Sequence, residues 1–221
     1  MLKFFNREKF IILLTMLLLN VIAAPFFSNT GYFELVLDIT FTGVMLSAIF
    51  SLSKSGTVSL VASVTLMLPC LFFIWLGYFY TPKENVILAS SVLQAFFILY
   101  IALMIILSIF KAPKVTRDVI AAAVVVYLFA SLLFAKLYMI LELVYPGSFS
   151  MDHNLIVESP GVLKYFSIVT LSTLGYGDIV PMSSPARSLV SVEAIFGQIY
   201  LAVLVARLVS MHGSASSGKK G

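Results

Sequence analysis

The chain contains six apolar runs that are each long enough to cross a lipid bilayer as a helix, which takes about 20 residues. They cover residues 10–27, 32–52, 58–80, 85–110, 118–145 and 185–210. The composition agrees, because 61% of the residues are hydrophobic and 11% are charged, against about 45–50% and about 25% in soluble domains. The sequence therefore predicts an all-α integral membrane protein with six transmembrane helices.

The first run could also be the apolar part of a secretory signal peptide, because Lys3, Arg7 and Lys9 precede it. A signal cleaved after Ala24 would leave Pro25 directly behind the cut, which is unfavourable. We expect the run to be retained as the first transmembrane helix.

A seventh apolar segment, residues 160–172, is too short to cross a membrane. A helix of this length rises by only about 20 Å, and the hydrocarbon core of a bilayer is roughly 30 Å thick. Ser159 suits the N-cap position and Pro160 the first position of a helix. We expect a re-entrant half-helix that enters and leaves on the same side.

The basic residues predict how the chain lies in the membrane. With the N-terminus in the cytoplasm, the inner side collects Lys3, Arg7, Lys9, Lys54, Lys111, Lys114, Arg117, Arg207, Lys219 and Lys220. The outer side collects Lys83, Lys164 and Arg187. This excess inside follows the positive-inside rule, so both termini are expected in the cytoplasm of a multi-pass cell-membrane protein. The scattered basic residues also argue against a nucleic-acid-binding face, despite a net charge of +4.

Directly after the half-helix, residues 173–177 read Thr-Leu-Gly-Tyr-Gly, with Asp178 and Pro181 behind them. In a soluble protein Gly-Tyr-Gly is usually a turn, but here a half-helix precedes it and apolar runs flank it. The segment closely resembles the selectivity filter of potassium channels, with Leu174 in place of the commoner Val or Ile. The chain is similar to that family over about residues 116–211, and only in its layout before them.

The resemblance implies a homotetrameric, K⁺-selective pore, because one chain supplies one wall of a filter. Carbonyl groups of Thr173, Leu174, Gly175 and Tyr176 would replace the water around K⁺, with the Thr173 hydroxyl at the inner end. Gly175 and Gly177 are expected to adopt positive φ at little cost.

Aromatic residues of the half-helix would support this filter. Tyr176 is expected to pack against Tyr165 and Phe166, and Asp178 to accept a hydrogen bond from Tyr165. These roles come from the matching family positions.

The resemblance also implies a gate in the last helix. Gly197 lies twenty residues after Gly177, where the family's inner helix bends. A glycine inside a helix costs about 1 kcal/mol relative to alanine, so it needs a reason, which is either bending or close helix packing. Gln198 is expected to face the water-filled cavity, with Leu201 and Val205 narrowing its inner mouth.

Two charged residues lie inside predicted spans, Lys136 in the fifth and Glu193 in the sixth. Each is eight or nine residues from the outer end of its helix, which corresponds to a depth of about 12–13 Å. Unpaired charges at that depth are costly, so we expect an ion pair between them. The alternatives are that Lys136 reaches water or that Glu193 is neutral.

The first four spans are arranged like a voltage-sensor domain but lack its charges. No Lys, Arg, Asp or Glu occurs between Asn85 and Phe110, and a sensor needs several, each worth about 2.3 kcal/mol per 100 mV. We expect little voltage dependence. Glu34 and Asp38, four residues apart, could bind a cation or proton or lie near the outer interface.

We therefore expect four parts, with membrane lipids around them. These are a sensor-like module at 1–111, a linker at 112–117, a pore domain at 118–211 and a short disordered tail at 212–221. We expect no cofactor besides the permeant K⁺, no cytoplasmic ligand-binding domain and no catalysis. Alternatives are a weakly selective cation channel, a subunit of a potassium-uptake transporter, or a non-conducting protein.

Overall fold

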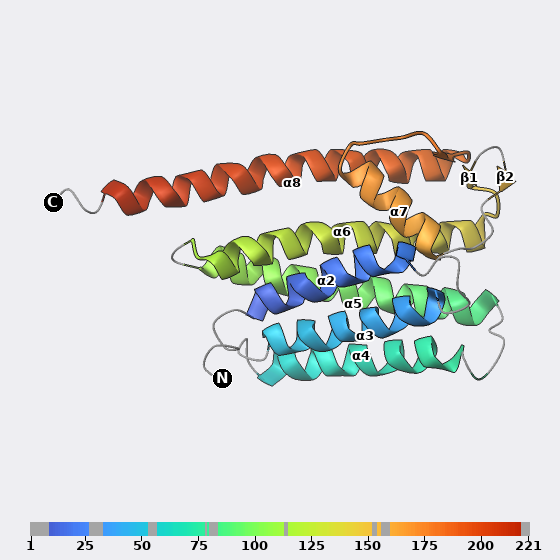
Figure 1. Cartoon of the computed structure of the whole chain (residues 1–221), viewed down its shortest axis with the longest axis horizontal. Coiled ribbons are helices and arrows are strands. Elements are labelled where there is room, and N and C mark those ends of the chain that lie inside the picture. The colour runs from blue at the N-terminus through green and yellow to red at the C-terminus, as the bar shows by residue number, and fades with distance from the viewer. Residues whose placement is uncertain are drawn as a thin grey trace. The chain divides into compact units, whose positions relative to one another are not determined.

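The computed structural model describes residues 9–26, 33–52, 57–77, 79, 84–112, 115–151, 154–155 and 160–217. Its long helices are α2 (Lys9–Phe26), α3 (Phe33–Leu52), α4 (Thr57–Leu76), α5 (Glu84–Lys111), α6 (Arg117–Val144) and α8 (Ser184–Ser217). One shorter helix is α7 (Pro160–Leu171), drawn in orange in Figure 1. Each helix coincides with a predicted apolar segment, because long apolar runs satisfy their backbone hydrogen bonds only as helices. Ser159, the expected N-cap of α7, lies outside the described residues.

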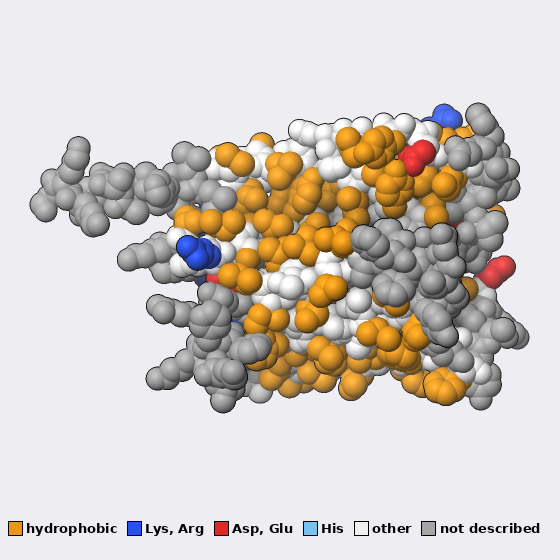
Figure 2. Space-filling view, in the orientation of Figure 1, with side chains coloured by type: hydrophobic (Ala, Val, Ile, Leu, Met, Phe, Trp, Pro, Cys, Tyr) orange, Lys and Arg blue, Asp and Glu red, His pale blue; other side chains and the backbone are white. Residues whose placement is uncertain are grey.

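Within these ranges, five helices are long and apolar enough to cross a membrane: α3, α4, α5, α6 and α8. The apolar part of α2, Lys9–Ile22, is shorter than that criterion, so its crossing stays a prediction. Figure 2 shows mostly hydrophobic side chains along the helices and few charged ones. The fold is that of an all-α membrane protein.

The contacts divide the chain into two units. Unit 1 comprises residues 1–81 and 99–128, and unit 2 comprises residues 82–98 and 129–221. This division runs through α5 and α6, whereas the predicted boundary is the linker at 112–117. The linker residues 113–114 lie outside the described part of the chain.

In unit 1, α2 and α3 form the main helix pair. The Asn20 amide donates to Thr40 Oγ1 at 2.7 Å, and Ser51 Oγ donates to the Lys9 carbonyl oxygen at 3.0 Å. Asp38 is half-buried, and the side chain of Glu34 is outside the described atoms, so the role of this pair stays open.

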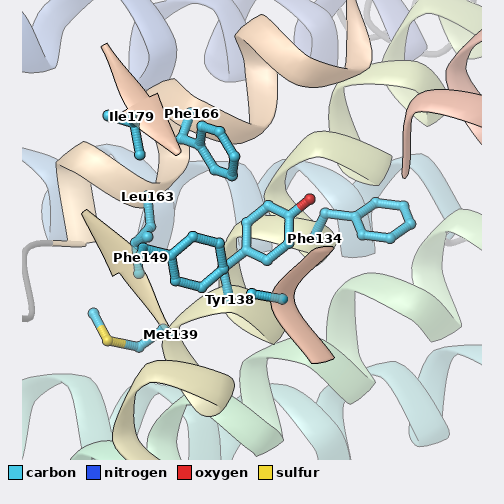
Figure 3. Packing of buried hydrophobic residues seen from close by; sticks show 8 residues of the cluster. Phe134, Tyr138, Met139, Phe149, Leu163, Phe166 and Ile179 are labelled. Atoms are coloured by element: carbon cyan, nitrogen blue, oxygen red, sulfur yellow. The ribbon is translucent and has the colours of Figure 1, made fainter. Parts of the chain in front are cut away.

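Unit 2 contains an aromatic core that holds α6 and α7 together. Figure 3 shows the ring of Tyr138 among those of Phe134, Phe149 and Phe166. The Tyr138 centroid lies 5.1 Å from that of Phe149 and 5.4 Å from that of Phe166. Leu163 fills the same cluster without exposed surface. This core fixes the short helix α7 against α6.

A small antiparallel sheet, which the sequence did not predict, follows the helix ends of unit 2. Strand β1 (Phe149–Met151) pairs with β2 (Asn154–Leu155) and with β3 (Ile179–Pro181), in the order β2-β1-β3. The carboxylate of Glu142 accepts from the backbone N–H of Gly147 at 2.7 Å and thereby closes the turn before β1. The sheet thus joins the segment after the Gly-Tyr-Gly motif to the end of α6.

The last helix also runs farther than expected. Residues 212–217 belong to α8, although their small and polar side chains predicted disorder. The preceding apolar helix extends into this segment, since each added residue gains a backbone hydrogen bond once a helix exists.

Candidate functional site

The half-helix α7 ends in a Schellman motif that delivers the chain into the Thr-Leu-Gly-Tyr-Gly segment. The Leu174 N–H donates to the Val169 carbonyl at 2.9 Å, and the Thr173 N–H donates to the Thr170 carbonyl at 2.9 Å. These are the two bonds of the motif, and they place Thr173 at the left-handed position after the helix, with φ of 59°. Glycine usually occupies that position, so a β-branched residue there is strained by about 1–3 kcal/mol. The first residue of the segment is therefore held by the helix that precedes it.

Positive φ values alternate along the segment. Thr173, Gly175 and Gly177 have φ of 59°, 56° and 79°. Leu174 and Tyr176 are not among the described residues with positive φ. A Cβ built on Gly175 or Gly177 meets nothing within 4 Å, so these glycines are required for backbone conformation and not for space. The expected positive φ at both glycines is confirmed.

The segment is exposed on the single chain. Leu174 is 56% and Tyr176 66% exposed, although both carry large apolar groups. The segment thus presents two large side chains on the surface of the single chain.

At the outer end of the segment, Tyr165 Oη donates to Asp178 Oδ2 at 2.8 Å, which is the contact expected from the sequence. This hydrogen bond raises the pKa of Tyr165 to about 12. The bond joins the middle of α7 to the residue that follows Gly177, and so closes the segment into a loop with both ends fixed to the same helix.

Phe166 lies on another side of α7 from Tyr165. It is buried in the aromatic core, where its centroid is 5.6 Å from that of Phe149. Packing of Tyr176 against the rings of Tyr165 and Phe166 stays a prediction that concerns the assembled protein.

At the inner end of the segment, α8 contributes a polar side chain. The Gln198 amide Nε2 donates to Thr173 Oγ1 at 3.3 Å. Leu201 and Val205 lie three and seven residues farther along α8 and are 42% and 58% exposed in the single chain. Their spacing places them on the same side of the helix as Gln198.

Gly197 is a close-packing position. A Cβ on Gly197 would lie 2.4 Å from the Leu171 carbonyl oxygen and 3.1 Å from Leu171 Cδ1. The last turn of α7 therefore rests directly on the backbone of α8. Of the two explanations for this glycine, the structure contains the close approach, and bending at a gate stays a prediction.

Glu193 has partners other than the one expected. Its Oε2 accepts from Tyr138 Oη of α6, and its Oε1 contacts Ser167 Oγ of α7. Both carboxyl oxygens of Glu193 therefore have a hydroxyl group beside them, and the ion pair with Lys136 stays a prediction. Residues two apart on a helix point about 200° apart, so Lys136 leaves α6 on the side opposite to Tyr138.

Sequence reasoning missed Tyr138, Ser167 and Leu171 as neighbours of the inner helix. The signal for the first two was available, since a buried carboxyl group requires hydrogen-bond partners and small or aromatic hydroxyl residues on facing helices can supply them. The close approach of Leu171 to Gly197 depends on where the two helix backbones lie, and the type of side chain at position 171 does not indicate this.

Comparison with known proteins agrees with this geometry. Residues 114–212 match the model of a family described as an ion channel. The chain is 46% identical over 59 residues to two-pore potassium channel 4 of Arabidopsis thaliana, covering 27% of this chain and 19% of that protein. It is 30% identical over 96 residues to the inward rectifier potassium channel Kirbac3.1 of Paramagnetospirillum magnetotacticum, covering 42% of this chain and 29% of that protein.

A third relative, two-pore potassium channel 5 of Arabidopsis thaliana, is 37% identical over 65 residues, which cover 28% of this chain and 16% of that protein. The chain thus spans less than a third of the length of each of these relatives. No solved structure gave a significant match. Residues 114–212, which carry α6, α7, the Gly-Tyr-Gly segment and most of α8, thus match an ion-channel family, and the relatives named here are potassium channels.

Proposed function

We propose that the protein is a homotetrameric channel that conducts K⁺ selectively and passively across the cell membrane. The observation that carries this proposal is the alternation of positive φ at Thr173, Gly175 and Gly177 in a segment held at both ends by α7. Carbonyl groups of residues 173–176 would replace the hydration water of K⁺, with Thr173 Oγ1 at the inner end.

The fixed ends of the segment support selectivity over mere permeability. One account of K⁺ selectivity is that the oxygen ligands keep a number and spacing that suit K⁺ better than a competing ion. The Schellman motif at Thr173 and the Tyr165–Asp178 hydrogen bond restrain the two ends. The carboxyl end of α7 adds a partial negative charge beside Thr173, which favours a cation.

Four copies are proposed because one chain provides one wall of the pore. Leu174 and Tyr176 are more than half exposed on the single chain, and neighbouring subunits would cover them. Gln198, Leu201 and Val205 would then line the cavity below the filter, and Val192, Ile195, Ile199 and Val203, each more than half exposed, would face neighbouring subunits or lipid.

The orientation in the proposal has both termini in the cytoplasm, as the positive-inside count favours. The filter then opens to the outside. Gating by α5 is not part of the proposal, because this helix carries charged residues only at its ends, Glu84 and Lys111.

The experiment is K⁺ flux into liposomes that contain the purified protein, with Na⁺ replacing K⁺ in a parallel sample. We expect K⁺ flux that barium blocks, little Na⁺ flux, and loss of both K⁺ flux and block in Gly175→Ala. Equal Na⁺ and K⁺ flux would favour the weakly selective channel, and absence of flux in an intact tetramer would favour the non-conducting alternative.

A further inference from the structure

Glu193 lies at the meeting point of the three pore helices. Its side chain has no exposed surface, and neither do those of Tyr138 and Ser167, which contact its two carboxyl oxygens. Tyr138 comes from α6, Ser167 from α7 and Glu193 from α8. We call these three residues the Glu193 cluster.

The number of protons in the cluster decides the state of the carboxyl group. Ser167 Oγ lies within hydrogen-bond distance of Glu193 Oε1 and also 2.7 Å from the Ser131 carbonyl oxygen. A hydroxyl group has one proton, and a carboxylate and a carbonyl only accept. If Glu193 were ionised, one of these two oxygens would face Ser167 Oγ without a hydrogen between them. Tyr138 cannot supply it, because its single proton points to Oε2.

A protonated carboxyl group on Glu193 supplies the missing hydrogen. In that state its own proton would go to Ser167 Oγ, while Ser167 donates to the Ser131 carbonyl and Tyr138 donates to the other carboxyl oxygen. Every buried polar atom of the cluster then has a partner, and no net charge lies at membrane depth, where an ionised carboxylate is costly.

We propose that Glu193 is a neutral carboxylic acid whose proton links α8 through α7 to α6, and that it positions the filter. The first half concerns the chemical state of one side chain. The second half rests on the proposed function, because it needs a conducting filter to be observed.

The positioning role follows from the register of the two helices. Ser167 and Leu171 are one turn apart on α7, and their contacts on α8, Glu193 and Gly197, are also one turn apart. The Glu193 cluster thus joins α7 to α8 one helical turn before the contact between the Leu171 carbonyl and Gly197. Thr173, two residues beyond Leu171, begins the filter.

The charged groups on the three helices leave this assignment intact. Lys136 leaves α6 on the side opposite to Tyr138. Arg187 lies six residues before Glu193 on α8, and its Nε donates to the Pro181 carbonyl. The groups that contact the two carboxyl oxygens of Glu193 are the hydroxyls of Tyr138 and Ser167.

The protonation is tested by infrared difference spectroscopy of the intact protein in liposomes at neutral pH. The carbonyl stretch of a neutral carboxyl group is separate from the bands of a carboxylate. The spectrum of the native protein minus that of Glu193→Gln should contain a neutral-carboxyl band, because the variant lacks this group. Loss of a carboxylate band instead would overturn the proposal. This measurement requires no ion conduction, so it is independent of the proposed function.

The positioning role is tested by K⁺ flux in the same liposomes. Glutamine has the donor and acceptor of a neutral acid, so Glu193→Gln should conduct within about twofold of the native protein. Glu193→Leu, which leaves Tyr138 and Ser167 without a buried partner, should lose about tenfold or more. Ser191→Ala is the matched control, because the Ser191 hydroxyl is exposed and donates only within α8, to the Arg187 carbonyl.

Equal loss of flux in Glu193→Gln and Glu193→Leu would overturn the positioning by a neutral acid. If Glu193→Leu does not assemble, the positioning role is tested by comparing K⁺ flux of Glu193→Gln with that of the native protein. A native protein that conducts no K⁺ would overturn the positioning role together with the proposed function, while the infrared result still decides the protonation.

Discussion

The Leu171 carbonyl oxygen occupies the place where a side chain at position 197 would begin, 2.4 Å from an ideal Cβ on Gly197. The pore helix α7 and the inner helix α8 are therefore in contact through their backbones. Thr173, the first residue of the proposed filter, lies two residues after Leu171. We therefore expect a displacement of α8 at Gly197 to act on the last turn of α7 and on the start of the proposed filter.

Gly197→Ala should therefore disturb the filter. Alanine at this position forces two backbones apart, at a cost of about 1–3 kcal/mol for overpacking. We expect a lower thermal midpoint of the purified protein and a smaller ratio of K⁺ to Na⁺ flux. Gly43→Ala is the control, since its Cβ would meet only Met16 Sδ at 3.6 Å. A Gly197→Ala protein with native selectivity and only a changed open probability would indicate a hinge instead.

The predictable part of this structure is the part that hydrophobicity and local backbone rules determine. The apolar runs became helices with nearly the expected ends, and Gly175 and Gly177 took the expected positive φ. The Tyr165–Asp178 hydrogen bond was expected from the resemblance to the potassium-channel family, and it joins two residues that are thirteen apart. Each of these features is encoded within about fifteen residues.

The rest depends on where helices meet. Depth along two helices suggested Lys136 as a partner of Glu193, but depth carries no information about angle, so the contact of Glu193 with Tyr138 was not foreseen. The strands β1 and β3 are three residues long and exist through long-range pairing. Thr173 is unfavourable for positive φ by itself, and only the hydrogen bonds to Val169 and Thr170 place it there.

Substitutions at Thr173 separate backbone strain from the role of its hydroxyl. Thr173→Gly relieves the left-handed conformation, whereas Thr173→Ala keeps it, so the glycine variant should be more stable by about 1 kcal/mol. Inside a helix the usual order is the opposite, with the alanine variant more stable than the glycine variant. Thermal midpoints of the two tetramers check it, and a more stable alanine variant would contradict the Schellman assignment.

Both variants lack the hydroxyl group, so both should weaken block by barium applied from the inner side. Thr173→Ser keeps the hydroxyl and should retain the block. An unchanged block in Thr173→Ala would mean that Thr173 Oγ1 is not an ion ligand.

The bond from Tyr165 to Asp178 predicts a defined pH window. Tyrosine ordinarily has a pKa of about 10, and the bond raises that of Tyr165 to about 12. The neutral phenol is the form that donates, so its stabilisation is complete below pH 10 and is lost as the pH rises through about 12. Tyr165→Phe should therefore lower the stability of the filter equally at pH 6 and pH 9.

Recovery of conduction after K⁺ is removed and restored measures that stability. Tyr165→Phe and Asp178→Asn should both slow the recovery. The double variant should be no worse than the more damaging single one, because the two changes remove the same bond. Strictly additive effects would show that the two residues act separately.

Gln198 links the inner helix to the inner end of the filter, and its loss should change how ions enter from the cytoplasm. Gln198→Leu removes the donor to Thr173 Oγ1, a bond whose net value is about 0.5–1.5 kcal/mol. We expect the affinity of internal barium block to change by about two- to tenfold, and that of external block to remain the same. Single-channel recordings in planar bilayers separate the two sides. Ile199→Val is the control, because Ile199 is 58% exposed and adjacent on α8. Equal changes of internal and external block would mean that Gln198 does not act at the inner end of the proposed filter.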